Sequence, residues 1–368
     1  MPKVSEDLAK KFAKEKTSAY QKWVEQEGLE IISAHYIPNL HHVELKPWSR
    51  REGYGVYVNH DSSRTSNDCY VCEIPPGGKL APQKQIYEEM IYILDGRGST
   101  AVWNDRGQRT TFEWQAGSLF AIPLNTWHQH FNTAGVMSAR FLAVTNFPMV
   151  MNLFEDQEFV FNNPYEFKNR FNGEPDYFHP KETLSGFLLE TNFVPNVRTL
   201  PLVEAKERGA GGGHIRFNLA KGTMNSHISE FPVGTYKKAH LHGPGAHVVI
   251  LSGEGYSLMW PEGSSPNRYE WTEGSMVVPP DRWYHQHFNI GSSPARYLAL
   301  KYEGTAIRNE QGVPKAWISK RLGGDQIDYV DENPLVRQWF EQSLRKHGLD
   351  SKMASYYDQE RETLPPNA

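Results

Sequence analysis

The sequence lacks an excess of charge of either sign, a long apolar run and a set of cysteines. Its 39 Lys and Arg residues are offset by 43 Asp and Glu residues, a formal net charge of −4, so the basic surface that nucleic acids require is missing. No apolar stretch approaches the length that crosses a bilayer. The charged first residues are not followed by an apolar segment, which argues against a secretory signal. We therefore expect a cytoplasmic protein without nucleic-acid or membrane partners.

The two cysteines, Cys69 and Cys72, do not predict a redox or zinc site. They lie in an extended segment, where residues three apart point to opposite faces of a strand. Two thiolates alone also fall short of the four ligands of a structural zinc site. We expect both side chains to serve in packing.

An internal duplication is the main feature that the sequence does contain. Residues 73–132 and 230–289 align without a gap at an offset of 157, and eighteen of the sixty pairs are identical. Both copies end in His-Gln-His-Phe-Asn. The copies differ where the second has His240 and His242, because the first has Gln83 and Gln85 there. The chemistry is therefore expected in the second copy.

Each copy is a series of short runs of β-branched and aromatic residues separated by turn residues. This pattern is typical of a small antiparallel sandwich or barrel, so we expect an all-β fold with two tandem jelly-roll-like β-barrels and flanking N- and C-terminal helices. The expected segments are an N-terminal helix and lead-in arm (1–67), a first barrel (68–149), an aromatic-rich connector that packs on the barrels (150–213), a second barrel (214–305) and a C-terminal extension with a helix (306–368).

Capping signals predict two helices outside the barrels. The first runs over 5–27, with Ser5 as N-cap and Gly28 as its end. The second begins with Asn333 as N-cap and ends before Gly348, and we expect it to cover a barrel or a subunit interface. The tail after about Met353 is polar, and we expect it to be loosely ordered.

Four histidines of the second copy form two pairs with strand spacing. His240 and His242 are two residues apart, so both rings leave the same face of a strand. His285 and His287 repeat this spacing after the Pro-Pro segment. If the strands curl into a barrel, both pairs point into one interior. Converging imidazoles suit divalent Fe, Ni, Cu or Zn.

The order of these residues resembles the cupin family. The family's first motif, G-x5-H-x-H-x3,4-E-x6-G, and its second, G-x5-P-x-G-x2-H-x3-N, resemble the segments that begin at Gly234 and at Gly274. The resemblance carries His240, His242 and His285 over as metal ligands. The family's Glu falls on Ala246, which cannot bind a metal, and the inner glycine of the second motif is absent from both copies.

Several neighbours of this set are further candidates. His247 becomes a fourth ligand if a bulge turns it to the ligand face. His287 shares a face with His285 and is expected to contact substrate or support a ligand. Arg282 or Lys238 are candidates to bind an anionic group, and the candidate pocket wall consists of the aromatic residues Tyr236, Tyr256, Trp260 and Trp283.

The first copy keeps Glu89 and His128 but offers two glutamines as its other candidate ligands. Amides are poor transition-metal ligands, so we expect Gln83 and Gln85 to join Glu89 and His128 in a hydrogen-bonded, structural interior.

Three-histidine sites among cupins resemble those of gentisate-type and diketone-cleaving dioxygenases, which use Fe(II). The resemblance therefore implies an Fe(II) enzyme that cleaves a small aromatic or enolisable oxygenated substrate with O2. Mn, Ni or Zn are alternative metals. A non-redox lyase, isomerase or decarboxylase and a non-catalytic binding protein remain open as alternatives. We expect a homo-oligomer.

Overall fold

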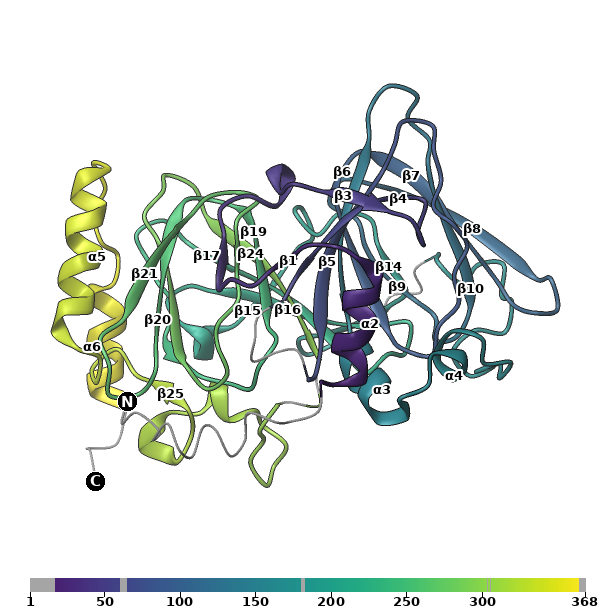
Figure 1. Ribbon diagram of the computed structural model, residues 1–368. Coiled ribbons are helices and arrows are strands. Elements are labelled where there is room, and N and C mark those ends of the chain that lie inside the picture. Colours follow the sequence, from purple (N-terminus) through teal and green to yellow (C-terminus); the bar gives the residue numbers. More distant parts are fainter. Residues whose placement is uncertain (1–16, 60–64, 180–182, 303, 305, 364–368) are drawn as a thin grey trace, which may run out of the picture.

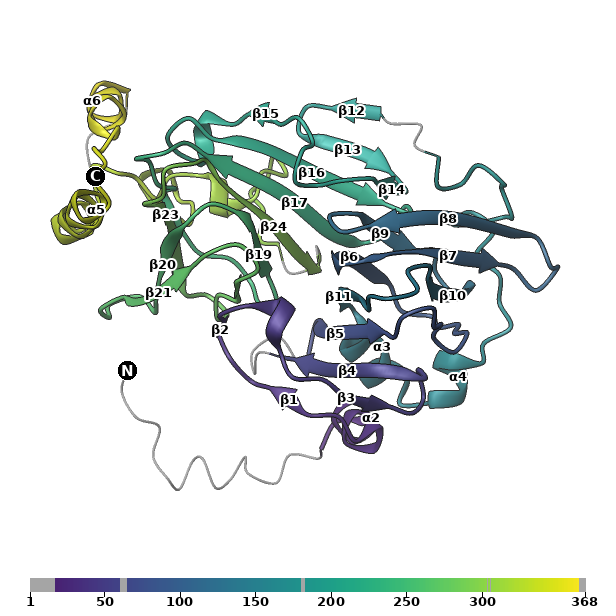
Figure 2. The same cartoon turned by 90° about the horizontal axis from the view of Figure 1, so that it is seen from above.

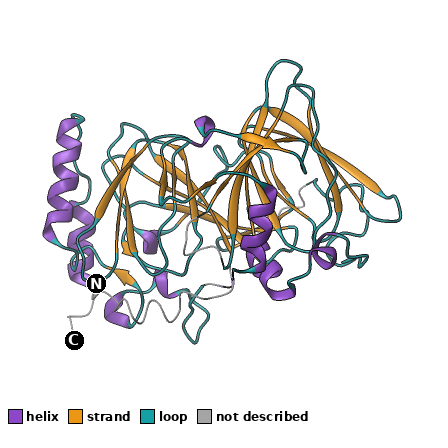
Figure 3. Ribbon diagram, viewed as in Figure 1, coloured by secondary structure: helices purple, strands orange, loops and turns teal. Residues whose placement is uncertain are grey.

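Two β-sandwiches lie side by side in the computed structural model (Figure 1). The structure describes residues 17–59, 65–179, 183–302, 304 and 306–363. An eight-stranded and a three-stranded sheet form the first sandwich, and a nine-stranded and a five-stranded sheet form the second. The all-β fold with two tandem modules and flanking helices is confirmed (Figure 3).

The first sandwich contains most strands between residues 31 and 145. Its large sheet consists of β1 (Ile31–Ile32), β3 (Lys46–Trp48), β4 (Gly53–Val58), β5 (Asp68–Ile74), β6 (Glu89–Asp95), β9 (Leu119–Ile122), β11 (Ala139–Thr145) and β14 (Phe193–Val194). Its small sheet consists of β7 (Arg97–Trp103), β8 (Arg109–Gln115) and β10 (Trp127–Asn132).

The second sandwich repeats this plan. Its large sheet consists of β2 (Tyr36–Ile37), β12 (Thr183–Ser185), β13 (Leu188–Thr191), β15 (Val203–Glu204), β16 (Gly213–Leu219), β17 (Met224–Phe231), β19 (His247–Ser252), β22 (Met276–Val277) and β24 (Ala295–Tyr302). Its small sheet consists of β18 (Ala239–His240), β20 (Gly255–Trp260), β21 (Asn267–Trp271), β23 (Tyr284–Asn289) and β25 (Gln326–Ile327).

The large sheet of the second sandwich has one face toward the first sandwich. Ile215, Phe217 and Leu298 on this face belong to the same hydrophobic core as Val71 and Leu142 of the first sandwich. Because side chains alternate along a strand, the residues between them face the interior of the second sandwich. This alternation places the polar residues described below.

Two short strands cross between the modules. The arm strand β2 pairs with β22 of the second sandwich, although the neighbouring β1 pairs with β4 of the first. In the connector, β14 pairs with β9 of the first sandwich, and β13 pairs with β16 of the second. Figure 2 shows the arm passing from one sandwich to the other.

The N-terminal helix is shorter than predicted. It is α2 (Ala19–Glu27), with Ser18 as N-cap in a capping box with Gln21, and Gly28 ends it as expected. Residues 5–16 lie outside the described part of the chain. The prediction of one continuous helix over 5–27 is wrong, because Ser18 is extended and starts a new helix.

The remaining helices cover the two ends of the molecule. In the connector, α3 (Phe147–Phe154) and α4 (Gln157–Phe161) lie beside α2 near the first sandwich (Figure 1). At the other end, α5 (Pro334–Lys346) starts from the predicted N-cap Asn333 and covers the small sheet of the second sandwich, where Phe340 packs against Phe288. None of the helices within the described ranges has the length and apolar composition of a membrane span.

The described part of the tail after Met353 is helical, contrary to the sequence prediction of a loosely ordered tail. It forms α6 (Ala354–Thr363), and both Met353 and Tyr357 are buried in the cluster beneath α5. The polar composition of the tail gives no indication that these two side chains are buried. Their burial stabilises a helix that the local sequence favours only weakly.

Candidate metal centre

Three histidines converge in the second sandwich. His240 lies on β18, directly opposite His285 on β23, and His242 follows in the loop after β18. One ring nitrogen from each residue lies within 4.8 Å of the other two. The ring centroids of His240 and His285 are 4.2 Å apart, and those of His242 and His285 are 4.6 Å apart. The structure thus brings together the three ligands that the motif predicts.

Backbone carbonyls fix the tautomer of all three rings. The Nδ1 atoms of His240, His242 and His285 lie 3.1, 2.8 and 3.3 Å from the carbonyl oxygens of Lys238, Gly243 and Trp283. A carbonyl oxygen only accepts, so each Nδ1 carries the proton and donates it. Each Nε2 then keeps its lone pair, which is the form that binds a metal.

The surroundings also keep these imidazoles neutral. Burial lowers the pKa of His285 to about 3. Burial, followed by the nearby cation Arg208 and the other two rings, holds the pKa of His240 well below its ordinary value. Burial and the His285 ring do the same for His242. The group therefore fits a divalent metal, because protons do not compete for the Nε2 lone pairs near neutral pH.

Among the residues that the structure describes, no carboxylate joins this group. Ala246, which occupies the position of the family's Glu, lines the same cavity as the three histidines. Its neighbour Val248 lines the cavity as well, so His247 between them points to the opposite face of β19. There it lies in a buried position beside Asn67, 3.5 Å from Nδ2 to Nδ1, in the contact between the sandwiches. The structure does not bring His247 to the ligands, because β19 has no bulge at this position.

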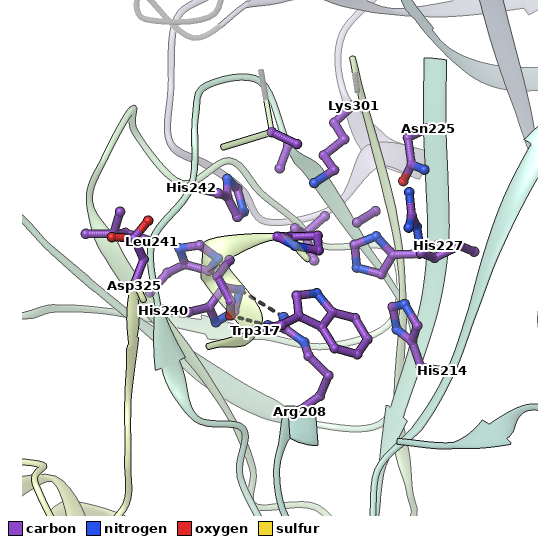
Figure 4. Close-up of a pocket in the computed structure, with 18 of the residues that line it drawn as sticks. Arg208, His214, Asn225, His227, His240, Leu241, His242, Lys301, Trp317 and Asp325 are labelled. Carbon is purple, nitrogen blue, oxygen red and sulfur yellow. Dashed lines mark hydrogen bonds between the residues drawn. The ribbon is translucent and has the colours of Figure 1, made fainter. Parts of the chain in front are cut away.

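The three histidines line a cavity that is partly open to solvent. His287 also lines it, and its Nδ1 lies 2.7 Å from the hydroxyl of Ser257. Arg208 is buried at the edge of the group, where Nη2 donates to Nε2 of His240 at 2.9 Å and Nη1 donates to the carbonyl of Ala316 at 3.0 Å (Figure 4). The arginine thus touches a predicted ligand directly.

Other predicted pocket residues lie elsewhere. The side chain of Arg282 is exposed and does not line the cavity, although its backbone amide donates to the carbonyl of His242. Lys238 forms ion pairs with Asp328 and Glu360. None of the four predicted aromatic residues lines the cavity; Tyr236, Tyr256 and Trp260 pack beneath α5, and Trp283 packs near Tyr36. The aromatic residues that do line it are Tyr297 and Trp317.

The first sandwich has a buried polar cluster at the equivalent place. Gln83 pairs with His128 across the strands as His240 pairs with His285. Glu89 lies 3.3 Å from Arg51 and 3.4 Å from the amide of Gln85. Burial alone would raise the pKa of Glu89, but Arg51, His128 and the hydroxyl of Tyr70 outweigh it and lower the pKa. Glu89 is thus a charged partner of Arg51 in this interior.

Sequence reasoning missed several residues that line the cavity. These residues are Arg208, His214, Arg216, Asn225, His227, Lys301 and Trp317. A signal existed for one of them, because the offset of 157 that relates the two copies also relates Arg51 to Arg208.

Comparisons with known proteins agree with this architecture. The sequence profile described as the cupin domain matches residues 70–145, in the first sandwich. No significant match was found among curated protein sequences. Two solved structures of oxalate decarboxylase, one of them a tryptophan-to-tyrosine variant of the Bacillus subtilis protein, superpose with a TM-score of 0.50 each. They are 14% and 13% identical to this chain, and in both cases 89% of this chain and 86% of the other are covered.

At this level of identity the superposition supports the fold alone. The profile match and the superposition together identify both sandwiches as cupin-like. This chain therefore contains a segment that matches the cupin domain and two cupin-like β-sandwiches, of which the second contains a buried three-histidine group suited to a divalent metal.

Proposed function

We propose that this protein is an Fe(II)-dependent dioxygenase that cleaves a small, acidic, aromatic or enolisable compound in the second sandwich. The observation that carries the proposal is the donor set: His240, His242 and His285 are neutral, and Ala246 stands where a carboxylate would lower the charge of the centre. A dication held by neutral ligands keeps its full charge for an anionic, chelating substrate. When bound, Fe(II) supplies a Lewis acid for the substrate oxygens and electrons for O2.

The side chains around the group are suited to hold such a substrate. The Nη2 of Arg208 donates to the Nε2 lone pair of His240, which a metal also needs. When a metal binds this lone pair, the buried Nη2 of Arg208 needs another acceptor, and an anionic oxygen of the substrate is a suitable one. Arg208 is therefore assigned to substrate binding.

We assign His287 to proton transfer during the reaction. Its Nδ1 is paired with Ser257, whose hydroxyl accepts from Nε1 of Trp271. The remaining ring nitrogen, Nε2, is the one available to a molecule in the cavity. Trp317 and Ala316, which also line the cavity, belong to the C-terminal extension.

A non-redox decarboxylase or lyase is the second candidate. The buried guanidinium of Arg208 favours it, because a cation beside a metal centre stabilises both a bound carboxylate and the negative charge left when CO2 departs. The superposed structures carry the name oxalate decarboxylase. In this second candidate the metal would be Mn²⁺ rather than iron.

Metal analysis combined with oxygen uptake tests the proposal. Protein purified without chelators, then loaded anaerobically with Fe(II), should consume O2 with a member of a panel of gentisate, catechols and β-diketones. Release of CO2 without any uptake of O2, in the presence of Mn²⁺, would favour the second candidate. Protein that binds neither metal would support a non-catalytic binding protein.

Two matched variants locate the centre. His240→Ala should lose the metal while keeping its far-UV circular dichroism, because the first sandwich does not depend on it. Gln83→Ala, at the equivalent position of the first sandwich, should keep the metal. Retention of full metal content by His240→Ala would contradict the assignment.

A further inference from the structure

The cavity of the three-histidine group has a second polar wall. In Figure 4, His240 and His242 lie on one side of the cavity, and His214, His227 and Asn225 lie on the other. The two sides come from different sheets, since His240 and His285 belong to the small sheet, His242 follows it in a loop, and the opposite residues belong to β16, β17 and β24 of the large one. We call the opposite side the distal wall, which consists of His214, Arg216, Asn225, His227 and Lys301.

Strand register assembles the distal wall. Arg216 on β16 pairs with His227 on β17, and Asn225 on β17 pairs with Lys301 on β24. Their neighbours along the strands, such as Ile215, are packed toward the first sandwich. The wall is therefore rigid and follows directly from the alternation of the strands.

His214 is the part of this wall that indicates a missing partner. It is 2% exposed, and neither ring nitrogen has a hydrogen-bond partner among the described residues. Its ring lies 4.9 Å from the ring of His227 and 5.0 Å from that of Trp317, between centroids. A buried imidazole that lines a cavity without a partner is costly, and a polar group of a bound molecule would satisfy it.

The electrostatics of the cavity favour an anion at the distal wall. Among the described residues that line the cavity, Arg208, Arg216 and Lys301 are cationic and Asp325 is a carboxylate. Burial, followed by neighbouring cations that include Arg208, holds the pKa of His214 well below its ordinary value, so the ring is a neutral donor. Positive charges in a partly desolvated cavity stabilise an anionic group.

We propose that the distal wall binds a second anionic group of the substrate, so that the substrate is a two-headed acid with a metal-binding end and a remote carboxylate. This inference rests on the proposed function for the identity of the first end. The facing sheets of a sandwich are about 10 Å apart. In a diacid whose two carboxylates are attached to each other or to neighbouring carbon atoms, the carboxylates are separated by only a few bonds. A substrate that contacts both walls therefore has several atoms between its two acidic groups.

Intervening side chains support this spacing. The ring centroids of His285 and His287 are 5.8 Å apart, those of His287 and Tyr297 are 5.2 Å apart, and those of Tyr297 and His227 are 6.0 Å apart. Two rings thus lie between the ligand His285 and the distal wall. They would line the middle of an extended substrate.

Calorimetric titration of the Zn²⁺-loaded protein tests the inference without turnover. The probes are 2-oxoglutarate and 2-oxopentanoate, which share a five-carbon 2-oxo acid and differ in the terminal carboxylate. We expect the diacid to bind about tenfold more tightly, the effect of one charge-assisted contact. Lys301→Met should remove this preference by weakening the binding of 2-oxoglutarate more than that of 2-oxopentanoate, whereas Lys346→Met, on the exposed end of α5, should change neither affinity.

Arg216→Met provides a second variant with the same expected result. Equal affinities of the wild-type protein for both acids, or an equal loss for both acids in Lys301→Met and Arg216→Met, would overturn the inference. The binding measurement involves neither O2 nor product. A preference of the Zn²⁺-loaded protein for the diacid, together with no oxygen uptake by the Fe(II)-loaded protein, would therefore refute the dioxygenase activity and still support the two-headed substrate.

Discussion

Replacement of Arg208 by methionine should change metal affinity and anion affinity in opposite directions. The guanidinium is buried, and its Nη2 donates at 2.9 Å to the Nε2 of His240, which is a predicted metal ligand. In the metal-free protein this hydrogen bond must break before the lone pair can bind a metal. Methionine fills similar volume and leaves the lone pair available.

The size of both effects follows from one charged hydrogen bond. Such a bond contributes about 1.5–3 kcal/mol, which corresponds to a factor of roughly 10–100 in an equilibrium constant. We therefore expect Zn²⁺ to bind Arg208→Met about 10–100-fold more tightly, and the loss of repulsion between two cations adds to this. An anionic ligand such as 2-oxopentanoate should bind the Zn²⁺-loaded variant about 10–100-fold more weakly.

Competition with a chromogenic chelator measures the Zn²⁺ affinity, and calorimetry measures the anion affinity. Arg208→Lys serves as the control, because it keeps the positive charge and loses the fixed fork that reaches both His240 and the carbonyl of Ala316. A merely structural role for Arg208 would lower both affinities together. Unchanged or weaker Zn²⁺ binding by the methionine variant would refute the reasoning.

Three further predictions concern the ligands, their missing carboxylate and the contact between the sandwiches. In metal-free protein the pKa of His285 is about 3 against roughly 6.5 unfolded. The unfolded state therefore takes up the proton first, and the contribution of His285 to stability should fall by about 1.4 kcal/mol per pH unit as the pH drops below about 6.5 toward 3. Urea titrations in chelator at pH 7, 6 and 5 should show this contribution missing from His285→Gln; identical pH dependence would contradict it. Ala246→Glu should bind Mn²⁺ at least about tenfold more tightly than the wild type by electron paramagnetic resonance, since carboxylates suit this ion, and an unchanged affinity would show that residue 246 does not reach the metal. Glu88→Ala removes a carboxylate that accepts from Thr223 and Met224 across the two sandwiches, so it should cost about 2–4 kcal/mol of unfolding free energy at constant metal content; loss of metal instead would place Glu88 in the site.

The sequence alone predicted the fold and the three histidines that the structure brings together. Both depended on local patterns: the duplication at a constant offset, and histidines spaced two apart on single strands. A strand has only two faces, so the spacing of His240 and His242 predicted a common face, and the two rings converge although His242 lies in the loop after β18. The same rule places His247 on the face of its strand that points away from the three histidines, and only a β-bulge could have turned its side chain toward them.

The distal wall could not be located in this way. His214, His227 and Lys301 belong to three different strands, and their proximity depends on the order and register of the large sheet. Sequence spacing carries no information on that order. The aromatic residues chosen from the sequence fail for a related reason: Tyr236 and Tyr256 face outward, where α5 covers them.

The strands that cross between the modules bear on how the duplicated halves can be separated. Strand β2 comes from the N-terminal arm but lies at the edge of the second sandwich, and β14 comes from the connector but lies at the edge of the first. A gene cut between the copies would therefore leave each half with an uncovered sheet edge, which is prone to intermolecular pairing. We therefore expect the two halves to fold as one unit, so exchange of the half with the three-histidine group between related proteins would require its arm and connector to be transplanted with it.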